Sequence, residues 1–301
     1  MKKLKDLVLR YGVLLRKRFS EKDKLKFLQM SQMEFESMGY QVDVTQTKIR
    51  AGKLGSKSYY NLYAGDYKNA DLVISTYYDT PVKSFNIYKQ EAFNSEKPKS
   101  YYIINFIIQL LIIGSFSALF IFALMPRLMD QSILSFWGVL SFLILGLGLY
   151  LIKNTRLGIA NKNNMIRNNS SVIAMFGLAE KNKGKNIAFS FIDDGTNDSY
   201  VGVKLLDDYL PSKRIKKIYL DSIGNSGDII VFTNDKFEGK LPKSSIKTDL
   251  NKRFDYLITS GTIENESVII DKANTGKDKD LDLSDLELKI NKLNKVINKI
   301  K

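Results

Sequence analysis

Acidic residues with a capacity for metal binding follow directly on an apolar stretch in the second half of the chain. Asp193 and Asp194 come after the segment NIAFSFI, and Asp198 follows three residues after Gly195. Carboxylate oxygens grouped in this way suit a hard cation such as Ca²⁺ or Mg²⁺. A solvated acidic turn at the end of a strand produces the same pattern, and it is the interpretation that we favour.

Two residue types that many active sites require are absent from the sequence. None of the 301 residues is His or Cys. His is the commonest general base near neutral pH and a principal zinc ligand, and thiol chemistry needs Cys. The composition therefore excludes Ser-His-Asp, Cys-His and His-zinc mechanisms, and it excludes disulfides.

The segments that would position these side chains alternate between short apolar runs and amphipathic stretches. Strands are expected at 40–48, 59–64, 70–76, 186–192, 215–220, 228–233 and 268–270. Helices are expected at 20–39, 171–180, 200–210, 243–259 and 283–300. Ser20 is a good N-cap for the first of these helices, with Asp23 completing a variant of the capping box. This order of elements predicts an α/β fold with a mostly parallel sheet flanked by helices.

Six segments, taken in order, resemble motifs of the di-zinc aminopeptidases (aminopeptidase Y type), the superfamily that also holds the glutamate carboxypeptidases. The segments are MGYQVDV, YYNLYAGDYKNADLVISTYYDTP, RNNSSVIAMFGLAE, NIAFSFIDDGTNDSYVGVKLL, IYLDSIG and NTGKDKDLDLSDLELKINKL. In the same order, the first three are similar to the family's helix that runs through Gly-Tyr into a strand, to its His-x-Asp strand and to its Asp-Asn-Ala-Ser-Gly stretch. The last three are similar to its Asp-Gly-Glu-Glu strand, to a later strand with Asp and Gly, and to its last His loop. The resemblance implies an aminopeptidase-like fold.

The resemblance also implies where a metal site would have been. The matching positions are Tyr77, Asp79, Asn168, Thr196, Asn197, Asp221 and Asn274. Tyr77 stands where the family has its first His, and the neutral Asn168 stands where the family has a carboxylate that bridges two zinc ions. Asp79 keeps the family's residue.

Most of the remaining positions also lack the metal-binding residue of the family. The family's Glu-Glu pair, which supplies the general base and a metal ligand, corresponds to Thr196 and Asn197. The last His corresponds to Asn274, and Asp221 remains where a terminal ligand is expected. Two zinc ions need a bridging carboxylate, terminal ligands and a base, and most of these are missing. The pattern therefore indicates a vestigial site without metal, in which we expect Asn168 and Asn197 to form hydrogen bonds.

Two uncharged apolar stretches, 103–125 and 133–152, interrupt this pattern between the His-x-Asp segment and the Asp-Asn-Ala-Ser-Gly segment. Each is long enough to cross a hydrocarbon core of roughly 30 Å as a helix. Residues 125–132 contain Pro126 and are expected to form the turn of a transmembrane hairpin. The sequence then divides into 1–100 and 154–301, two parts of one cytoplasmic domain, and 101–153, the hairpin.

Charged residues beside the two stretches set the expected orientation. The flanks carry Lys97, Lys99, Lys153, Arg156, Lys162 and Arg167. The turn carries only Arg127, offset by Asp130. The excess of positive charge on the flanks predicts a cell-membrane protein with two spans and both termini in the cytoplasm.

The amino-terminal residues 2–19 have apolar residues at helical spacing among many basic ones. An amphipathic helix lying on the inner leaflet has this composition. A helix packed on its own domain with a solvated basic face has the same composition, and the sequence does not separate the two.

The loss of metal ligands and base predicts a catalytically inactive pseudo-peptidase that needs no cofactor. Its expected partners are membrane lipid and another integral membrane protein, as in an accessory subunit of a transporter complex. The net charge of +14 suits a surface held against anionic lipid, and no nucleic-acid recognition motif accompanies it. The alternative is a membrane-anchored metal-dependent hydrolase or peptidase with an unusual site built from Asp79, Asp194 and Asp221. The oligomeric state stays open.

Overall fold

The computed structural model describes residues 2–50, 55–83, 89–94, 99–130, 134–155, 159–196, 200–211, 214–237, 240–246, 248–264, 267–273 and 276–300. The chain forms two compact units. The first consists of Met1–Pro81, Lys89–Glu96 and Lys162–Lys301, and the second of Val82–Tyr88 and Lys97–Asn161. In sequence, the second unit is therefore an insertion into the first.

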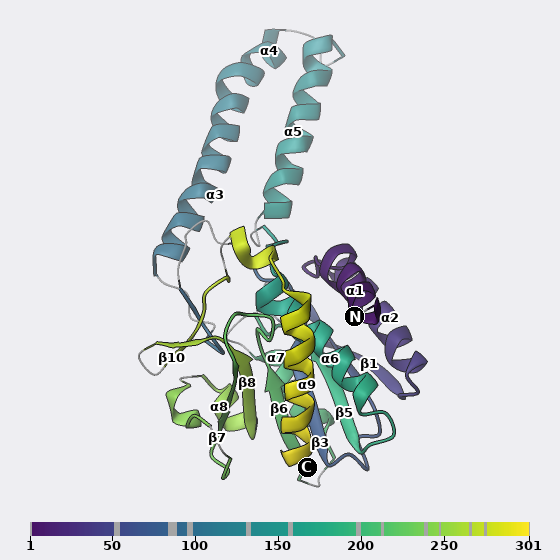
Figure 1. Ribbon diagram of the computed structural model, residues 1–301. Coiled ribbons are helices and arrows are strands. Elements are labelled where there is room, and N and C mark those ends of the chain that lie inside the picture. Colours follow the sequence, from purple (N-terminus) through teal and green to yellow (C-terminus); the bar gives the residue numbers. More distant parts are fainter. Residues whose placement is uncertain are drawn as a thin grey trace. The chain divides into compact units, whose positions relative to one another are not determined.

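A seven-stranded sheet organises the described part of the first unit, with the strand order β1-β2-β5-β3-β6-β8-β7 (Figure 1). Its strands are β1 (Val42–Arg50), β2 (Ser56–Ala64), β3 (Leu72–Tyr77), β5 (Ile187–Ile192), β6 (Lys216–Leu220), β7 (Ile229–Thr233) and β8 (Tyr256–Ser260). The central strands β5, β3, β6 and β8 run parallel to one another. The outer pairs β1–β2, β2–β5 and β7–β8 are antiparallel. The expected α/β fold is confirmed, with a mixed sheet that has a parallel centre.

Helices cover both faces of this sheet. One face packs against α1 (Lys2–Leu7), the π-helical segment η1 (Val8–Leu14), α2 (Glu21–Ser37), α6 (Ser170–Lys181) and α9 (Leu283–Ile300). The other face packs against α7 (Val201–Tyr209) and the short α8 (Leu250–Arg253). The central strands β3, β5 and β8 are buried along their whole length, as expected for strands covered on both sides.

Short segments complete the first unit. A small sheet has the order β4-β10-β9, formed by β4 (Gln90–Glu91), β10 (Ser267–Ile270) and β9 (Thr262–Glu264). The π-helical η4 (Met165–Asn169) leads into α6, and two 3₁₀ turns are η5 (Lys243–Ser245) and η6 (Gly276–Lys279).

The start of α2 shows how closely local sequence sets an element. Ser20 is the N-cap, its side chain accepts a hydrogen bond from the Asp23 N–H, and the Asp23 carboxylate reaches back to the Ser20 N–H. Gly39, just past the end of this helix, has a φ of +88°, which suits glycine. The predicted capping box is confirmed.

The helix expected at 243–259 is wrong. This stretch contains η5, the four-residue α8 and then β8, which pairs with β6 and β7. The segment YLITS is apolar, short and β-branched, and such a run does not separate a strand from a buried helix by its periodicity. The sheet therefore gains a strand that the sequence pattern concealed.

The second unit contains two long apolar helices. The first runs without a break through α3 (Lys99–Leu119), the π-helical η3 (Phe120–Leu124) and α4 (Met125–Asp130), and the second is α5 (Phe136–Thr155). The turn expected at 125–132 is wrong over its first six residues, because the helix continues to Asp130. Pro126, which has no N–H, is the second residue of α4 and lies two positions beyond the π-helical segment.

The two helices pack closely at one glycine. A Cβ atom at Gly148 of α5 would lie 1.9 Å from the ring of Phe116 in α3, so only glycine fits there. Near the facing ends of the two helices, the guanidinium of Arg127 in α4 lies 4.1 Å from the ring centre of Trp137 in α5. The pair forms a helical hairpin.

Among the described residues, Lys99–Asp130 is the one helix long and apolar enough to cross a membrane, and Phe136–Ile152 is a shorter apolar helix. Only 6% of the most apolar window of the first helix is buried. Its apolar side chains thus contribute little to any core within the described structure.

Candidate functional site

The site predicted from the sequence lies at the carboxyl ends of the parallel strands. Tyr77 ends β3 and Asp79 follows it, Thr196 follows β5, and Asp221 follows β6. In open α/β sheets ligands bind at this edge. Asn168 of η4 lies near the same edge. All five residues are buried, and hydrogen bonds join Tyr77 to Asp221 and Asn168, and Asp79 to Thr196. Asn197 and Asn274 lie outside the described residues.

Tyr77 occupies its place through two hydrogen bonds. Its hydroxyl donates to the backbone oxygen of Arg167 at 3.0 Å and to Oδ1 of Asp221 at 3.3 Å. Burial raises the pKa of the Tyr77 hydroxyl well above its usual value, and the neighbouring Asp221 raises it further. The phenol is therefore a neutral donor and offers no anionic oxygen to a cation.

Asp221 is satisfied by protein groups on both carboxylate oxygens. Besides Tyr77, it accepts hydrogen bonds from the Ser222 hydroxyl at 3.0 Å and from the Phe93 N–H at 3.3 Å. Burial raises the pKa of Asp221, while Arg167 counteracts this. Phe93 adopts a φ of 59° and Ser222 a φ of 52°. Two residues that donate to Asp221 thus have backbone in the left-handed region.

Asp79 bonds to the loop that follows β5. Its Oδ1 accepts from the Gly195 N–H at 2.8 Å, and its Oδ2 accepts from the Thr196 hydroxyl. Burial raises the pKa of Asp79 to about 6, against an opposing effect from Lys24. Thr196, which stands where a general base is expected, acts here as a donor to Asp79.

Asn168 connects two parts of the chain that the sequence analysis did not relate. Its amide nitrogen donates to the Tyr77 backbone oxygen at 3.0 Å, and its Oδ1 accepts from the guanidinium of Arg18. The expectation that Asn168 forms hydrogen bonds within the site is confirmed. The group that donates to the Asn168 oxygen is the positively charged guanidinium of Arg18.

Arg18 is completely buried and binds five acceptors. Its guanidinium donates to the side chains of Asn168 and Asn169 and to backbone oxygens of Tyr78, Leu15 and Tyr11. Its Cζ also lies 4.9 Å from the ring centre of Phe27. Burial lowers the pKa of Arg18 to about 9, while Asp79 opposes the shift. The group therefore remains cationic at neutral pH.

Two lysines neutralise the acidic pair after β5. Lys24 forms a buried ion pair with Asp193, and the half-exposed Lys57 pairs with the buried Asp194 at 3.0 Å. Asp193 also accepts from the Tyr60 N–H at 3.1 Å. The candidate hard-cation cluster is thus an internal salt-bridge cluster in its described part, and Asp198 lies outside the described residues.

The sequence analysis missed Arg18, Lys24 and Lys57 as members of the site. The chain has 46 Lys and Arg residues, and nothing in the local pattern distinguishes these three from the others. The weak signal available in the sequence was its excess of basic residues.

A pair of zinc ions does not fit these side chains. The residue at the bridging position is an amide whose oxygen faces a guanidinium, and a cation placed there would be repelled by Arg18. Both oxygens of Asp79 are occupied by Gly195 and Thr196. Within the described ranges, no three His, Cys, Asp or Glu side chains gather as metal ligands.

The remaining space at the site is small. The cavity beside Tyr77 and Asp221 has a volume of about 20 Å³. A single water molecule needs on the order of 10–15 Å³ by this measure. The cavity therefore has room for about one water molecule.

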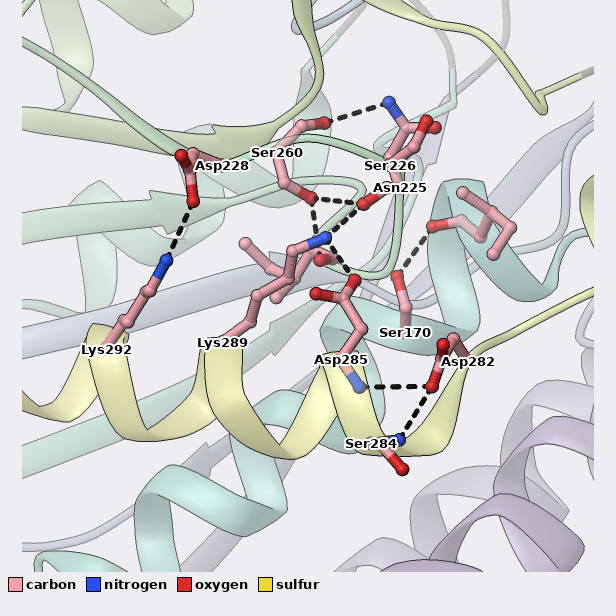
Figure 2. Close-up of polar contacts among 12 residues, drawn as sticks. Ser170, Asn225, Ser226, Asp228, Ser260, Asp282, Ser284, Asp285, Lys289 and Lys292 are labelled. Carbon is pink, nitrogen blue, oxygen red and sulfur yellow. Dashed lines mark hydrogen bonds and ion pairs between the residues drawn. The ribbon is translucent and has the colours of Figure 1, made fainter.

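A second polar centre anchors the loop that carries Asp221 and Ser222. Figure 2 shows Lys289 of α9 reaching from the helix to the backbone oxygen of Asn225 and to Asp285, which it meets at 2.6 Å. The Ser260 hydroxyl also donates to Asn225 O at 3.2 Å. Lys289 is 2% exposed, so this contact fixes the loop from inside the unit.

Comparisons with known proteins identify the fold. No protein-family model matches the sequence, and no curated protein matches it. A glutaminyl cyclase from Porphyromonas gingivalis is 11% identical, with a TM-score of 0.57 over 98% of each chain. A Zn-dependent exopeptidase from Parabacteroides distasonis is 12% identical, with a TM-score of 0.57 over 97% of each chain.

A zinc aminopeptidase from Bacillus subtilis is more distant. It is 8% identical with a TM-score of 0.51, covering 99% of this chain and 94% of the other. At such identities the likeness concerns the fold alone. The expected aminopeptidase-like fold is confirmed: the chain has the α/β fold found in zinc-dependent exopeptidases and glutaminyl cyclases.

Proposed function

We propose that this protein is a catalytically inactive pseudo-peptidase of the membrane whose α/β unit binds a partner protein. One observation carries the proposal: the buried guanidinium of Arg18 donates to Asn168 at the position where the resembled family places the carboxylate that bridges its metals. A cation supplied by the protein itself thus takes the place of a bound cation.

The groups around Arg18 support the loss of catalysis. Thr196 carries no titratable group for the role of general base, and the Tyr77 hydroxyl is a neutral donor to Asp221. The alternative hydrolase built from Asp79, Asp194 and Asp221 finds no support here, because each carboxylate already has protein donors or a lysine partner.

The two apolar helices support attachment to a membrane. Lys99–Asp130 exposes its apolar side chains, as a helix in contact with lipid does, and Gly148 lets α5 pack against Phe116. We propose that α3–α4 and α5 form a transmembrane hairpin, with both flanks and both termini in the cytoplasm because Lys and Arg gather on the flanks.

The partner that suits this architecture is another integral membrane protein. A two-span hairpin is too small to form a transport path by itself, whereas a folded α/β unit beside it offers a binding surface. We therefore propose an accessory subunit of a membrane transporter complex. Affinity purification of the full chain from membranes should recover an integral membrane protein in fixed ratio, and recovery of the chain alone would refute this part of the proposal.

Metal analysis and activity assays test the inactivity. The full chain is purified in detergent, incubated with Zn²⁺ and dialysed, and its metal content is measured alongside turnover of aminoacyl and glutaminyl peptides. We expect less than stoichiometric zinc and no turnover. Stoichiometric zinc, together with turnover that is lost in Asp79→Ala or Asp221→Ala, would overturn the proposal.

Reporter fusions test the topology. A reporter placed before Lys2 and another placed after Lys301 should both be active in the cytoplasm, and a reporter between Asp130 and Phe136 should be active outside. A cytoplasmic signal from the position between the helices would show that the hairpin does not cross the membrane.

A further inference from the structure

The amino-terminal segment of the first unit has two different faces. Its inner face is formed by Leu4, Leu7 and Tyr11, which are at most 8% exposed and belong to the main core. Gly12 lies against Met165, and a Cβ atom at Gly12 would meet the Met165 side chain at 2.5 Å. The segment is therefore packed on its own unit, which is the second of the two interpretations of its sequence.

The outer face of the same segment exposes large apolar side chains. Leu9, Val13 and Leu14 are 53%, 46% and 71% exposed. Single exposed apolar residues are common in soluble proteins, but these three lie within six consecutive residues on one side of η1. The segment thus presents apolar side chains that nothing in the described first unit covers.

Exposed basic residues flank these apolar side chains in the sequence. Lys5, Arg16 and Lys17 are exposed on either side of them in sequence. The nearby acidic groups are already paired: Arg10 binds Asp6 at 2.7 Å and Glu34 at 2.9 Å. Lys17 also lies 3.4 Å from Asp23, which offsets part of its charge. The balance of charge beside the apolar side chains is positive.

We propose that this outer face, Leu9, Val13 and Leu14 with Lys5, Arg16 and Lys17, docks on an anionic bilayer surface. Apolar side chains flanked by Lys and Arg enter the interface between headgroups and acyl chains, and the cations are attracted to anionic lipid. The inference rests on the proposed membrane location and adds a second point of contact, formed by the first unit.

The vestigial site and the docking face are parts of one segment. Arg18 donates to the backbone oxygens of Tyr11 and Leu15, and its own backbone exchanges hydrogen bonds with Thr80 at 2.7 and 3.0 Å. Leu14 and Arg16 lie between these anchor points. The charge centre that replaced the metal site thereby holds the docking face in a fixed position on the unit.

A single fluorescent label tests the docking. The chain has no Cys, so Leu14→Cys gives one attachment site for an environment-sensitive dye, and Leu288→Cys, on the 62%-exposed Leu288 of α9, gives a matched control. Both variants replace exposed side chains, so folding of the core is preserved. The full chain is reconstituted in phosphatidylcholine vesicles with and without phosphatidylglycerol, and brominated lipids serve as quenchers.

The expected result is a blue shift and quenching of the label at position 14 in anionic vesicles. Most of this signal should be lost at high salt and in an Arg16→Glu/Lys17→Glu variant, while the label at position 288 stays unquenched throughout. A label at position 14 that is unquenched, or that shifts to the blue without quenching because protein covers it, overturns the proposal.

The single tryptophan separates this result from the fate of the hairpin. Trp137 begins α5, so brominated lipids quench its emission if the hairpin is in the bilayer. Quenching of Trp137 without quenching at position 14 refutes the docking alone. Absence of quenching at Trp137 refutes the hairpin, and the label at position 14 then decides the docking by itself.

Discussion

The guanidinium of Arg18 donates a hydrogen bond to Oδ1 of Asn168, a residue 150 positions away in the sequence, in a fully buried part of the first unit. A second bond from the same nitrogen reaches Asn169. Because a guanidinium has five donors in a fixed planar arrangement, it can join several acceptors that a metal ion would otherwise organise. This contact ties the amino-terminal segment to the start of α6.

Replacing Arg18 should therefore destabilise the protein strongly. Arg18→Met leaves Asn168, Asn169 and several backbone oxygens without their donor, and we expect a loss of about 3–5 kcal/mol in the free energy of unfolding. Arg18→Lys should not restore stability, because an ammonium cannot reach the same acceptors. Arg16→Met, at an exposed position two residues away, is the control and should change stability by less than about 0.5 kcal/mol. Chemical denaturation of the full chain in detergent measures all three, and equal effects at positions 16 and 18 would contradict the assigned role.

Asp79 should make the protein less stable as the pH rises. Burial raises the pKa of Asp79 in the folded state to about 6, from 3.8 as its ordinary value. A carboxyl with a raised pKa binds more protons in the folded state, so its contribution is fully present below about pH 4 and is lost as the pH rises through 6. The difference in pKa corresponds to about 3 kcal/mol.

Asp79→Asn tests this pH dependence. The amide keeps an oxygen for the Gly195 N–H and carries no charge, so the decline in stability between pH 4 and pH 7 should become shallower. It should not vanish, because the raised pKa of Asp221 acts in the same direction. Asp249→Asn, on an exposed aspartate of the same unit, should leave the profile unchanged. Melting temperatures between pH 4 and pH 8 decide the matter, and parallel profiles for the wild type and Asp79→Asn would disprove it.

Lys289 and Lys292 offer a matched pair on one helix (Figure 2). Lys289 is buried and donates to Asn225 O, whereas Lys292 pairs with Asp228 at 2.7 Å on the surface. Lys289→Met should cost about 1–3 kcal/mol, because the backbone oxygen of Asn225 loses a buried charged donor. Lys292→Met should have a much smaller effect on stability, because its ion pair is exposed to solvent. Urea denaturation compares them, and a larger effect at Lys292 would contradict the anchoring of the loop after Asp221.

Gly148 should be required for packing in the helical hairpin. Gly148→Val places a side chain where the ring of Phe116 lies, and overpacking of this kind costs about 1–3 kcal/mol. Gly146→Val, on the same helix with open space around its Cβ position, should be tolerated. Titration with sodium dodecyl sulfate, followed by far-ultraviolet circular dichroism, measures helix unfolding in both variants. Equal midpoints would show that α3 and α5 do not depend on this contact.

A carboxylate introduced at position 168 should not create a metal site. In Asn168→Asp the new charge would pair with Arg18, since the guanidinium already donates to that oxygen. We expect no gain in zinc affinity by calorimetry. Zinc binding by Asn168→Asp with Arg18 still in place would show that the guanidinium does not exclude metal.

Many helices and strands can be predicted from the local sequence. The Ser20–Asp23 capping box, the buried strand β3 and the amphipathic α9 follow from the order of apolar and polar residues, because capping and periodic burial depend on near neighbours. The missing His residues remove the zinc ligands and the general base of the resembled family without any structure. The strand β8 was missed because YLITS has no periodicity that separates strand from helix.

Only the tertiary structure decided which basic side chains meet Asn168 and the acidic pair after β5. Arg18, Lys24 and Lys57 are three of 46 basic residues, and the sequence offers no reason for these rather than others to gather at the site, the first two buried and the third half exposed. Their partners Asn168, Asp193 and Asp194 lie more than a hundred residues away and meet them only after the sheet has brought β3 and β5 side by side. Local pattern specifies which segments form helices and strands, whereas burial of a charge depends on long-range packing that supplies its counter-charge or its acceptors.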